Sequence, residues 1–345
     1  MLTLLCALPA AAEALRIAVY DAPLARPGPG LLLRDLACTP LPTDIETTIA
    51  TIAALDADVL LVTGIDADHG GESLLLLASH LAALGLVYPY RLMPPSNRGL
   101  ASGHDLDGDG RAGGPGDAQG WGDFRGAGAM ALLSRLPILR SELRDFSTLL
   151  WRDLPGATLP RQPGGAPFPS EAAQRVQRLS SGGHWEVPLM LGSGQVLRLL
   201  ATHASPPVFD GPEDANGLRN RDELRFWQLF LNGWAPDGGP GARAPFVLAG
   251  RFNLDPERGE GRREVLDALL SDPRLADLRP GDGSGDGAAS HDTWRREGGG
   301  GLRLDYLLPS ADLRVLGTGV LALDPGSAAQ SRPVWLDIAL PDPPG

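Results

Sequence analysis

Short apolar runs that alternate with amphipathic segments constrain the fold of this chain more than any other feature. The runs at 15–21 (LRIAVYD), 196–204 (VLRLLATHA) and 246–249 (FVLA) have the length and composition of buried strands. Between them, 70–86 and 220–234 have the spacing of apolar residues that is typical of helices. Strands and helices that alternate in this way predict an α/β fold.

Further segments extend the same pattern. We expect a helix that begins with Thr43 or Asp44 as its N-cap, followed by the strand Val59–Val62. Late strands are predicted at 302–309 and 334–340. The chain has 345 residues and is 43% hydrophobic, which is enough for a large core. We therefore predict a single domain over residues 15–343.

The first 14 residues, MLTLLCALPAAAEA, join a short apolar stretch to small residues and resemble a secretory signal peptide. The alternative is a first buried strand or helix. Export would place the mature protein in the periplasm or outside the cell. It would also leave Cys38 as the one cysteine of the mature chain, so that no internal disulfide could form.

The net charge of −12 limits the classes of partner. Such an acidic surface disfavours broad electrostatic binding to nucleic acid, although a local basic pocket stays possible. No later apolar run reaches the roughly 20 residues that a membrane-spanning helix needs.

The stretch FVLAGRFNLDP, residues 246–256, ends a predicted core strand with Arg251. Catalytic groups often lie where a core strand ends and its loop begins. A metal-dependent nuclease or phosphatase would be expected to carry an acid there. Arginine has the opposite charge, so the stretch raises the question of what this side chain does.

Several blocks in order along the chain, RIAVYDAPL, DADVLLVTGIDAD, SGHDLDGDG, THASPPVFDGPEDANGLRNRDELRFW, GRFNLDP and LRLDYLLPS, resemble the endonuclease/exonuclease/phosphatase family, in particular its secreted bacterial members. The resemblance implies a DNase I-like, four-layered α/β/β/α sandwich of two packed mixed sheets. It also implies a divalent metal ion, usually Mg²⁺, and hydrolysis of phosphoesters at one end of the sheets.

Matching the family's motifs to this sequence divides its functional positions into two groups. Three family residues are retained: the transition-state histidine as His203, the asparagine of the GDxN motif as Asn253, and the aspartate of a late strand as Asp305. The asparagine of the first strand corresponds to Asp21, a degenerate metal position.

Four family positions have lost their metal-binding or acid–base groups. The metal-binding glutamate corresponds to Gly64, the water-orienting aspartate to Arg251, and the final aspartate and histidine to Gln330 and Ser331. Metal-assisted hydrolysis needs carboxylates for the ion and a base for the water. These losses argue against a catalytic Mg²⁺.

A physical role is open to Arg251. If Asp21 and Asp305 converge on the vacated site, a guanidinium between them would replace the metal ion with a tethered cation. The alternatives are that Arg251 points to solvent, or that it forms an anion pocket with His203 and Asn253.

A second motif is HDLDGDGRAGGPGD. Asp105, Asp107 and Asp109 with the following glycine match the first half of an EF-hand-type Ca²⁺ loop, in which Arg111 could supply a backbone carbonyl. The closing glutamate is absent, and we expect Asp117, or alternatively Asp123, in its place. The alternative is a solvated acidic turn without an ion.

Together these observations predict an exported protein of this fold with a degenerate metal site. We expect a catalytically inactive pseudoenzyme that binds or scaffolds another protein or a small anionic ligand, with Ca²⁺ at the 105–117 loop. The alternative is an active metal-dependent phosphodiesterase, phosphatase or nuclease with an altered site that uses Asp21, Asp66, Asp305 and His203.

Overall fold

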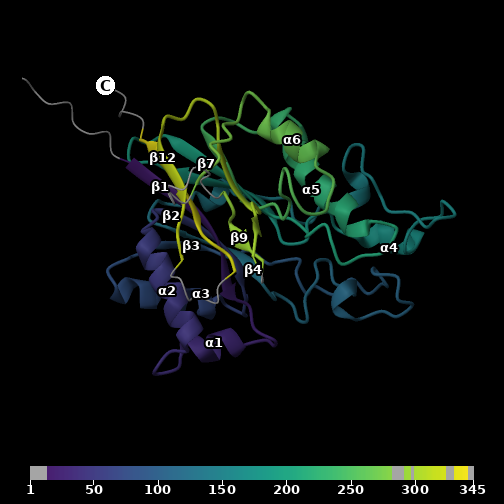
Figure 1. Ribbon diagram of the computed structural model, residues 1–345, viewed down its shortest axis with the longest axis horizontal. Helices are drawn as coiled ribbons and strands as arrows, with labels where there is room; N and C mark the ends of the chain where they lie inside the picture. The colour runs from purple at the N-terminus through teal and green to yellow at the C-terminus, as the bar shows by residue number, and fades with distance from the viewer. Residues whose placement is uncertain (1–13, 282–290, 297–298, 324–329, 341–345) are drawn as a thin grey trace, which may run out of the picture.

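The computed structural model describes residues 14–281, 291–296, 299–323 and 330–340. Two sheets pack face to face, and helices cover their outer faces (Figure 1). The predicted α/β/β/α sandwich is therefore confirmed. The predicted signal peptide, except for Ala14, lies outside the described residues.

The first sheet has the strand order β12-β13-β1-β2-β4-β3. β1 and β2 run parallel and the other neighbours run antiparallel, so the sheet is mixed. The bounds of these strands are β1 Ala14–Leu24, β2 Val59–Ile65, β3 Tyr90–Leu92, β4 Ala129–Ser134, β12 Val315–Val320 and β13 Val334–Ala339.

The second sheet has the order β11-β8-β7-β6-β5, in which only β7 and β8 are parallel. Its strands are β5 Arg144–Asp145, β6 His184–Met190, β7 Val196–His203, β8 Phe246–Arg251 and β11 Asp305–Pro309. A separate two-stranded ribbon joins β9 Trp294–Arg295 to β10 Gly301–Leu302.

The helices lie on opposite sides of this sandwich (Figure 1). Apolar residues of α1, α2 and α3 pack on the first sheet, whereas those of α5 and α6 pack on the second. The α-helices are α1 Leu31–Leu36, α2 Thr43–Leu55, α3 Glu72–Ala83, α4 Glu171–Val176, α5 Ala215–Leu231 and α6 Glu264–Leu270, and the short 3₁₀ helices are η1 Pro115–Asp117, η2 Arg140–Glu142 and η3 Trp151–Asp153.

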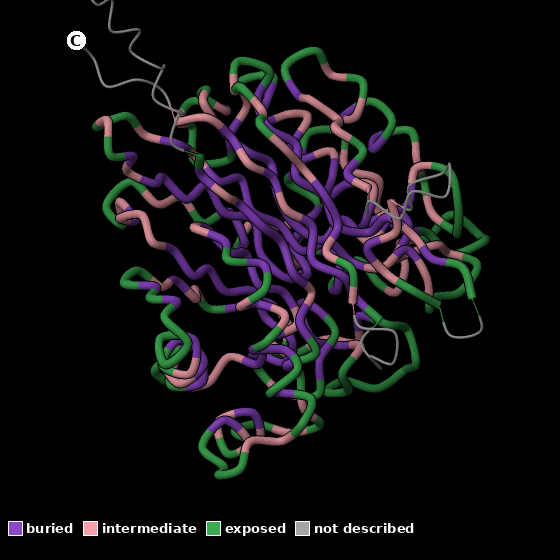
Figure 2. The backbone as a smooth tube through the Cα atoms, turned by 60° about the vertical axis from the view of Figure 1, so that its left-hand side comes forward, coloured by how far each residue is buried: buried purple, intermediate pink, exposed green. Residues whose placement is uncertain are grey.

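Burial divides the core into three layers, one between the sheets and one under each set of helices. Figure 2 shows the buried strands in the centre of the molecule. Val19, Leu61, Leu199 and Val247, from central strands of both sheets, are fully buried in the middle layer. This rigid double sheet fixes the positions of the side chains at its strand ends.

Several boundaries differ from the sequence-based expectation: the strand predicted at 302–309 begins at Asp305, the helix predicted at 220–234 is Ala215–Leu231, and the start of α2 also differs. The N-cap of α2 is Pro42, with neither Thr43 nor Asp44 in that place, and no side chain caps the helix. Thr43 and Asp44 are the first two helical residues. At this end of the helix, the negative charge of Asp44 interacts favourably with the helix dipole.

None of the helices in the described residues is long and apolar enough to cross a membrane.

Candidate functional site

Strand pairing brings the family positions to one end of the sandwich. In the second sheet, β7, β8 and β11 align His203 with Arg251, and Arg251 with Asp305. In the first sheet, β1 aligns Asp21 with Thr63 of β2. The side chains of Arg251 and Asp21 meet across the gap between the two sheets.

The Arg251 guanidinium lies between the two carboxylates that were predicted to converge. Its Nη1 atom is 3.1 Å from Asp21 Oδ2 and 3.2 Å from Asp305 Oδ2. The side chains of Arg251, Asp305 and Asp21 are 9%, 1% and 22% exposed, so water screens the pair with Asp305 poorly and reaches the pair with Asp21 from one side. The expected geometry is therefore confirmed, and the alternative in which Arg251 points to solvent is wrong.

Asn253 orients the arginine. Arg251 Nε donates a hydrogen bond to Asn253 Oδ1 at 2.8 Å, and Asn253 Nδ2 donates to the Ala204 carbonyl at 2.7 Å. The backbone of Asn253 has φ 55°, a left-handed conformation that asparagine tolerates better than most residues. Asn253, which matches the asparagine of the GDxN motif, thus orients Arg251, which lies at the position of the motif's aspartate.

Hydroxyl groups complete the surroundings of both carboxylates. Thr63 Oγ1 donates to Asp21 Oδ1 at 2.9 Å, and Ser331 Oγ donates to Asp21 Oδ2 at 3.0 Å. Thr293 Oγ1 donates to Asp305 Oδ2 at 2.7 Å. Sequence reasoning did not single out Thr63 or Thr293, although the place of Thr63 directly before Gly64 at a strand end was a usable signal.

The two acids that contact Arg251 have pKa values shifted in opposite directions. Burial would raise the pKa of Asp21, but Arg251, His203 and the hydroxyl groups of Thr63 and Ser331 together hold it below its ordinary value. Asp305 is more deeply enclosed, and burial raises its pKa to about 6 even though Arg251 opposes the shift. Burial would lower the pKa of Arg251, whereas Asp21 and Asp305 together raise it, so the arginine stays charged.

Gly64 leaves no room for the glutamate that the family motif has in this place. Its φ is 73°, and a Cβ atom added there would lie 2.6 Å from the Ala22 carbonyl oxygen and 3.0 Å from Asp21 Oδ1. The residue also interrupts the pairing of β2 with β4 as a bulge between Thr63 and Ile65. The backbone at this position therefore favours glycine.

The two positions of the final family motif lie in different surroundings. Gln330 is exposed, and its carbonyl accepts a hydrogen bond from the Arg295 amide. Ser331 is buried against Asp21 and donates to it, which leaves that hydroxyl without the basicity that a histidine would supply.

His203 is buried beside this cluster, and its Nδ1 atom has no hydrogen-bond partner among the described residues. Burial, together with the nearby charge of Arg98, lowers the pKa of His203 to about 3. The imidazole is therefore neutral at physiological pH.

Asp66, which the alternative function would use as a catalytic group, accepts hydrogen bonds from backbone amides. Its Oδ1 accepts a hydrogen bond from the Gly128 amide at 2.8 Å, and its Oδ2 accepts one from the Arg26 amide at 2.7 Å. A metal ion could be held by three or more His, Cys, Asp or Glu side chains that lie close together. The described residues contain one such group, and it lies outside the Arg251 cluster.

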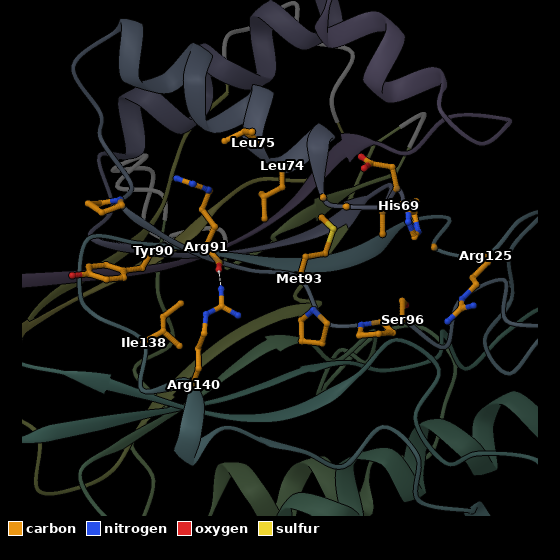
Figure 3. A pocket seen from close by; sticks show the side chains of 18 residues that line it. His69, Leu74, Leu75, Tyr90, Arg91, Met93, Ser96, Arg125, Ile138 and Arg140 are labelled. Carbon is orange, nitrogen blue, oxygen red and sulfur yellow. Dashed lines mark hydrogen bonds between the residues drawn. The ribbon is translucent and has the colours of Figure 1, made fainter.

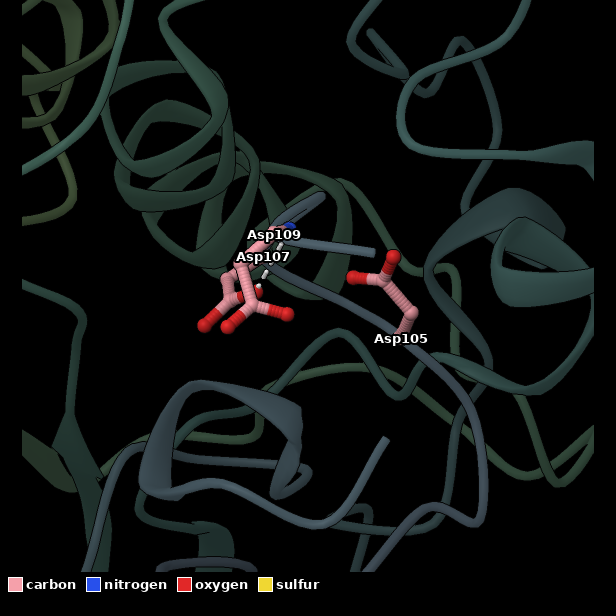
Figure 4. A group of neighbouring side chains, drawn as sticks. All are labelled: Asp105, Asp107 and Asp109. Carbon is pink, nitrogen blue, oxygen red and sulfur yellow. Dashed lines mark hydrogen bonds between the residues drawn. The ribbon is translucent and has the colours of Figure 1, made fainter. Parts of the chain in front are cut away.

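That group is Asp105, Asp107 and Asp109, whose ligand atoms all lie within 4.8 Å of one another (Figure 4). The carboxylates also order their own loop. Asp105 accepts hydrogen bonds from the amides of Gly108 and Gly110, and Asp109 accepts one from the Arg111 amide. The structure therefore brings together the first three predicted calcium ligands.

Asp117 has a different surrounding from the one expected of a closing ligand. Its Oδ1 accepts a hydrogen bond from the Leu106 amide, and its Oδ2 accepts from the amides of Gly113 and Gly114. The side chain is buried, and these contacts keep the pKa of Asp117 below its usual value although burial opposes them. It orders the backbone of its own loop and lies outside the three-aspartate group.

The sequence profile described as the Endonuclease/Exonuclease/phosphatase family matches residues 39–327. The chain belongs to this family. A comparison with curated proteins found no match.

Solved structures share the fold at low sequence identity. An endonuclease/exonuclease/phosphatase from Beutenbergia cavernae DSM 12333 is 18% identical with a TM-score of 0.57, over 96% of this chain and 72% of that chain. Sphingomyelinase C from Streptomyces griseocarneus is 18% identical with a TM-score of 0.52, over 94% and 99%. A family protein from Leptotrichia buccalis C-1013-b is 15% identical with a TM-score of 0.52, over 95% and 100%.

The residues at the sheet ends do not fit the divalent metal ion that the family implies. Arg251 Nη1 already contacts both carboxylates, and a metal ion beside it would add like charge at short range. The bulge at Gly64 has no space for another acidic side chain on that side.

Proposed function

We propose that this protein is a catalytically inactive member of its family, in which a buried arginine replaces the catalytic metal ion. The observation that carries the proposal is the double ion pair of Arg251 with Asp21 and Asp305. Catalysis by a metal ion depends on open coordination positions for water and substrate, which a guanidinium does not offer. The missing general base at Ser331 supports the same conclusion.

The proposed role is binding or scaffolding, with a protein or a small anionic ligand as the partner. This role is supported by the intact double sheet together with the internal ion pair at the sheet ends, where the family has its metal ligands. The signal-like N-terminus supports export to the periplasm or beyond.

Purified protein should not hydrolyse bis-p-nitrophenyl phosphate, p-nitrophenyl phosphate or plasmid DNA above the buffer background in Mg²⁺, Mn²⁺ or Ca²⁺. The physical reason is that Arg251 already pairs with both carboxylates and that Ser331 offers no base for the attacking water. Metal-dependent turnover that a His203→Ala variant abolishes would overturn the proposal in favour of an altered but active hydrolase.

We further propose that Ca²⁺ binds the loop of Asp105, Asp107 and Asp109. The three carboxylates are already close together, and a cation would relieve their mutual repulsion. The remaining ligands would be oxygens of the same loop, including the Arg111 carbonyl that the motif suggests, and water.

Millimolar Ca²⁺ should raise the melting temperature, and EDTA should reverse the shift, because an ion that binds only the native loop stabilises it by mass action. Mg²⁺ should have a smaller effect, since it demands tighter octahedral geometry. The shift should disappear in Asp107→Asn and persist in Asp312→Asn, a control at an exposed aspartate. An equal shift of the melting temperature in both variants would show that Ca²⁺ does not bind at this loop.

A further inference from the structure

A cavity of about 990 Å³ lies at the open edge of the sandwich, away from the Arg251 cluster. Its walls come from the edge strand β3 and the start of α3 on one side, and from the segment that leads into η2 on the other (Figure 3). We call it the edge cavity and define it by Leu74, Tyr90, Arg91, Met93, Arg125 and Arg140. Its size suits a ligand of drug-like or single-chain lipid dimensions.

The charge in this cavity is opposite to that of the whole protein. The chain has 42 acidic and 30 basic residues, yet Arg91, Arg125 and Arg140 all line the cavity. None of the salt bridges among the described residues involves any of these three arginines. In the part of the chain that the structure describes, these three arginines therefore have no acidic partner, although the molecule is rich in acids.

The one acid that lines the cavity is engaged elsewhere. Asp68 accepts hydrogen bonds from the amides of Glu72 and Ser73 at 2.8 and 2.7 Å, so it caps α3. These contacts outweigh burial and lower the pKa of Asp68. The N-terminus of α3 is thereby satisfied by the protein itself, and the arginines remain as the groups that can receive an anion.

Two of the arginines are held in place by carbonyl groups. Arg91 Nη1 donates to the Tyr88 carbonyl at 2.8 Å, and Arg140 Nη2 donates to the Arg91 carbonyl (Figure 3). A neutral carbonyl orients a guanidinium without cancelling its charge. Arg140 thus reaches the backbone of Arg91, and both side chains line the cavity with N–H donors that can bind an oxyanion.

The rest of the cavity is apolar. Figure 3 shows Leu74 and Met93 between the Arg91 end and the end that carries Arg125 and His69. Leu75, which also lines the cavity, is 44% exposed. An anion that also carried an alkyl chain would cover this surface, and removal of apolar area from water favours binding.

We propose that the edge cavity binds a single-chain anionic amphiphile. Its phosphate, sulfate or carboxylate headgroup would contact Arg91 and Arg140, and its alkyl chain would lie along Leu74 and Met93. This proposal is independent of whether the Arg251 cluster is inactive, because none of Asp21, His203, Arg251 and Asp305 lines the cavity.

Isothermal titration calorimetry with octyl phosphate, below its micellar concentration, tests the proposal. Octyl phosphate should bind with a stoichiometry of one, and both inorganic phosphate and 1-octanol should bind at least about tenfold more weakly, because each lacks one half of the recognition. The double variant Arg91→Gln/Arg140→Gln should weaken the binding of octyl phosphate by roughly tenfold or more.

Two further variants separate local from general effects. Arg161→Gln/Arg243→Gln removes the same charge from exposed positions outside the cavity and should leave the affinity unchanged. Leu75→Asp, at an exposed position in the cavity wall, should weaken the binding of octyl phosphate and leave the melting temperature of the protein unchanged.

Three results would overturn the proposal. The first is an absence of saturable binding of octyl phosphate. The second is an equal affinity in the cavity variant and the control pair, which would assign binding to net charge. The third is an affinity for inorganic phosphate or for 1-octanol equal to that for octyl phosphate. Equal binding of phosphate would show that the alkyl chain contributes nothing, and equal binding of 1-octanol would show that the charged headgroup contributes nothing.

Discussion

Arg251→Ala should lower the free energy of unfolding by about 3–5 kcal/mol, the cost typical of removing one partner from a buried ion pair. The substitution leaves Asp21 and Asp305 facing one another without the cation that both contact. Urea or thermal unfolding at pH 7.5 measures the change. Arg262→Ala, which removes an exposed ion pair with Asp214, is the matched control and should cost less than about 1 kcal/mol.

The deficit of Arg251→Ala should depend on pH in a definite direction. The pKa of Asp305 is already raised to about 6, and loss of the arginine raises it further. A carboxyl whose folded pKa lies above its unfolded value favours folding at low pH and loses this contribution as pH rises through the folded pKa. The variant should therefore approach wild-type stability near pH 4. Equal melting of variant and wild type at pH 7.5 would show that the arginine does not stabilise the site.

Gly64→Ala should lower the free energy of unfolding by about 2–5 kcal/mol, the sum expected for a left-handed alanine and a steric overlap. The added Cβ would lie 2.6 Å from the backbone oxygen of Ala22, which cannot rotate away as a side chain could. Thermal unfolding compared with wild type provides the measurement.

Gly30→Ala isolates the contribution of the overlap. Gly30 has φ 74°, nearly the value of Gly64, but nothing lies within 4 Å of a Cβ placed there. This control should cost only about 1–2 kcal/mol, the penalty of the left-handed conformation alone. Equal costs at both positions would mean that the bulge yields, and that a larger side chain at residue 64 is sterically possible.

The same overlap affects any attempt to restore the family's chemistry. Four substitutions together would restore the side-chain types that the family motifs have: Gly64→Glu, Arg251→Asp, Gln330→Asp and Ser331→His. The structure indicates that residue 64 has no space for glutamate and that residue 330 faces solvent. Reversal would therefore require backbone changes as well as the side chains.

The fold was predictable where sequence pattern and burial coincide. The apolar run of β8 and the amphipathic pattern of α5 gave correct element types because each packs in a continuous core. β12, with sequence VLGTGV, escaped prediction because two glycines and its partial exposure hide the alternation of a strand. β6 carries Pro188 in its centre, which weakens the usual signal of a strand.

The site was predictable in its charges but not in its fine geometry. Aligning Arg251 with a family acid sufficed to expect its contact with Asp21 and Asp305. The role of Asn253 as the group that orients the arginine depends on a left-handed backbone that a sequence pattern does not display. Thr293 reaches Asp305 from a loop between glycine-rich segments, and only the tertiary fold brings the two together.

The central claim is that a guanidinium occupies the place of the metal ion. A crystal grown in millimolar Mn²⁺, with diffraction data collected at the manganese absorption edge, tests it most directly. We predict no anomalous density between Asp21 and Asp305, with Arg251 Nη1 within hydrogen-bond distance of both. An anomalous peak between the two carboxylates, with Arg251 turned away, would contradict the account.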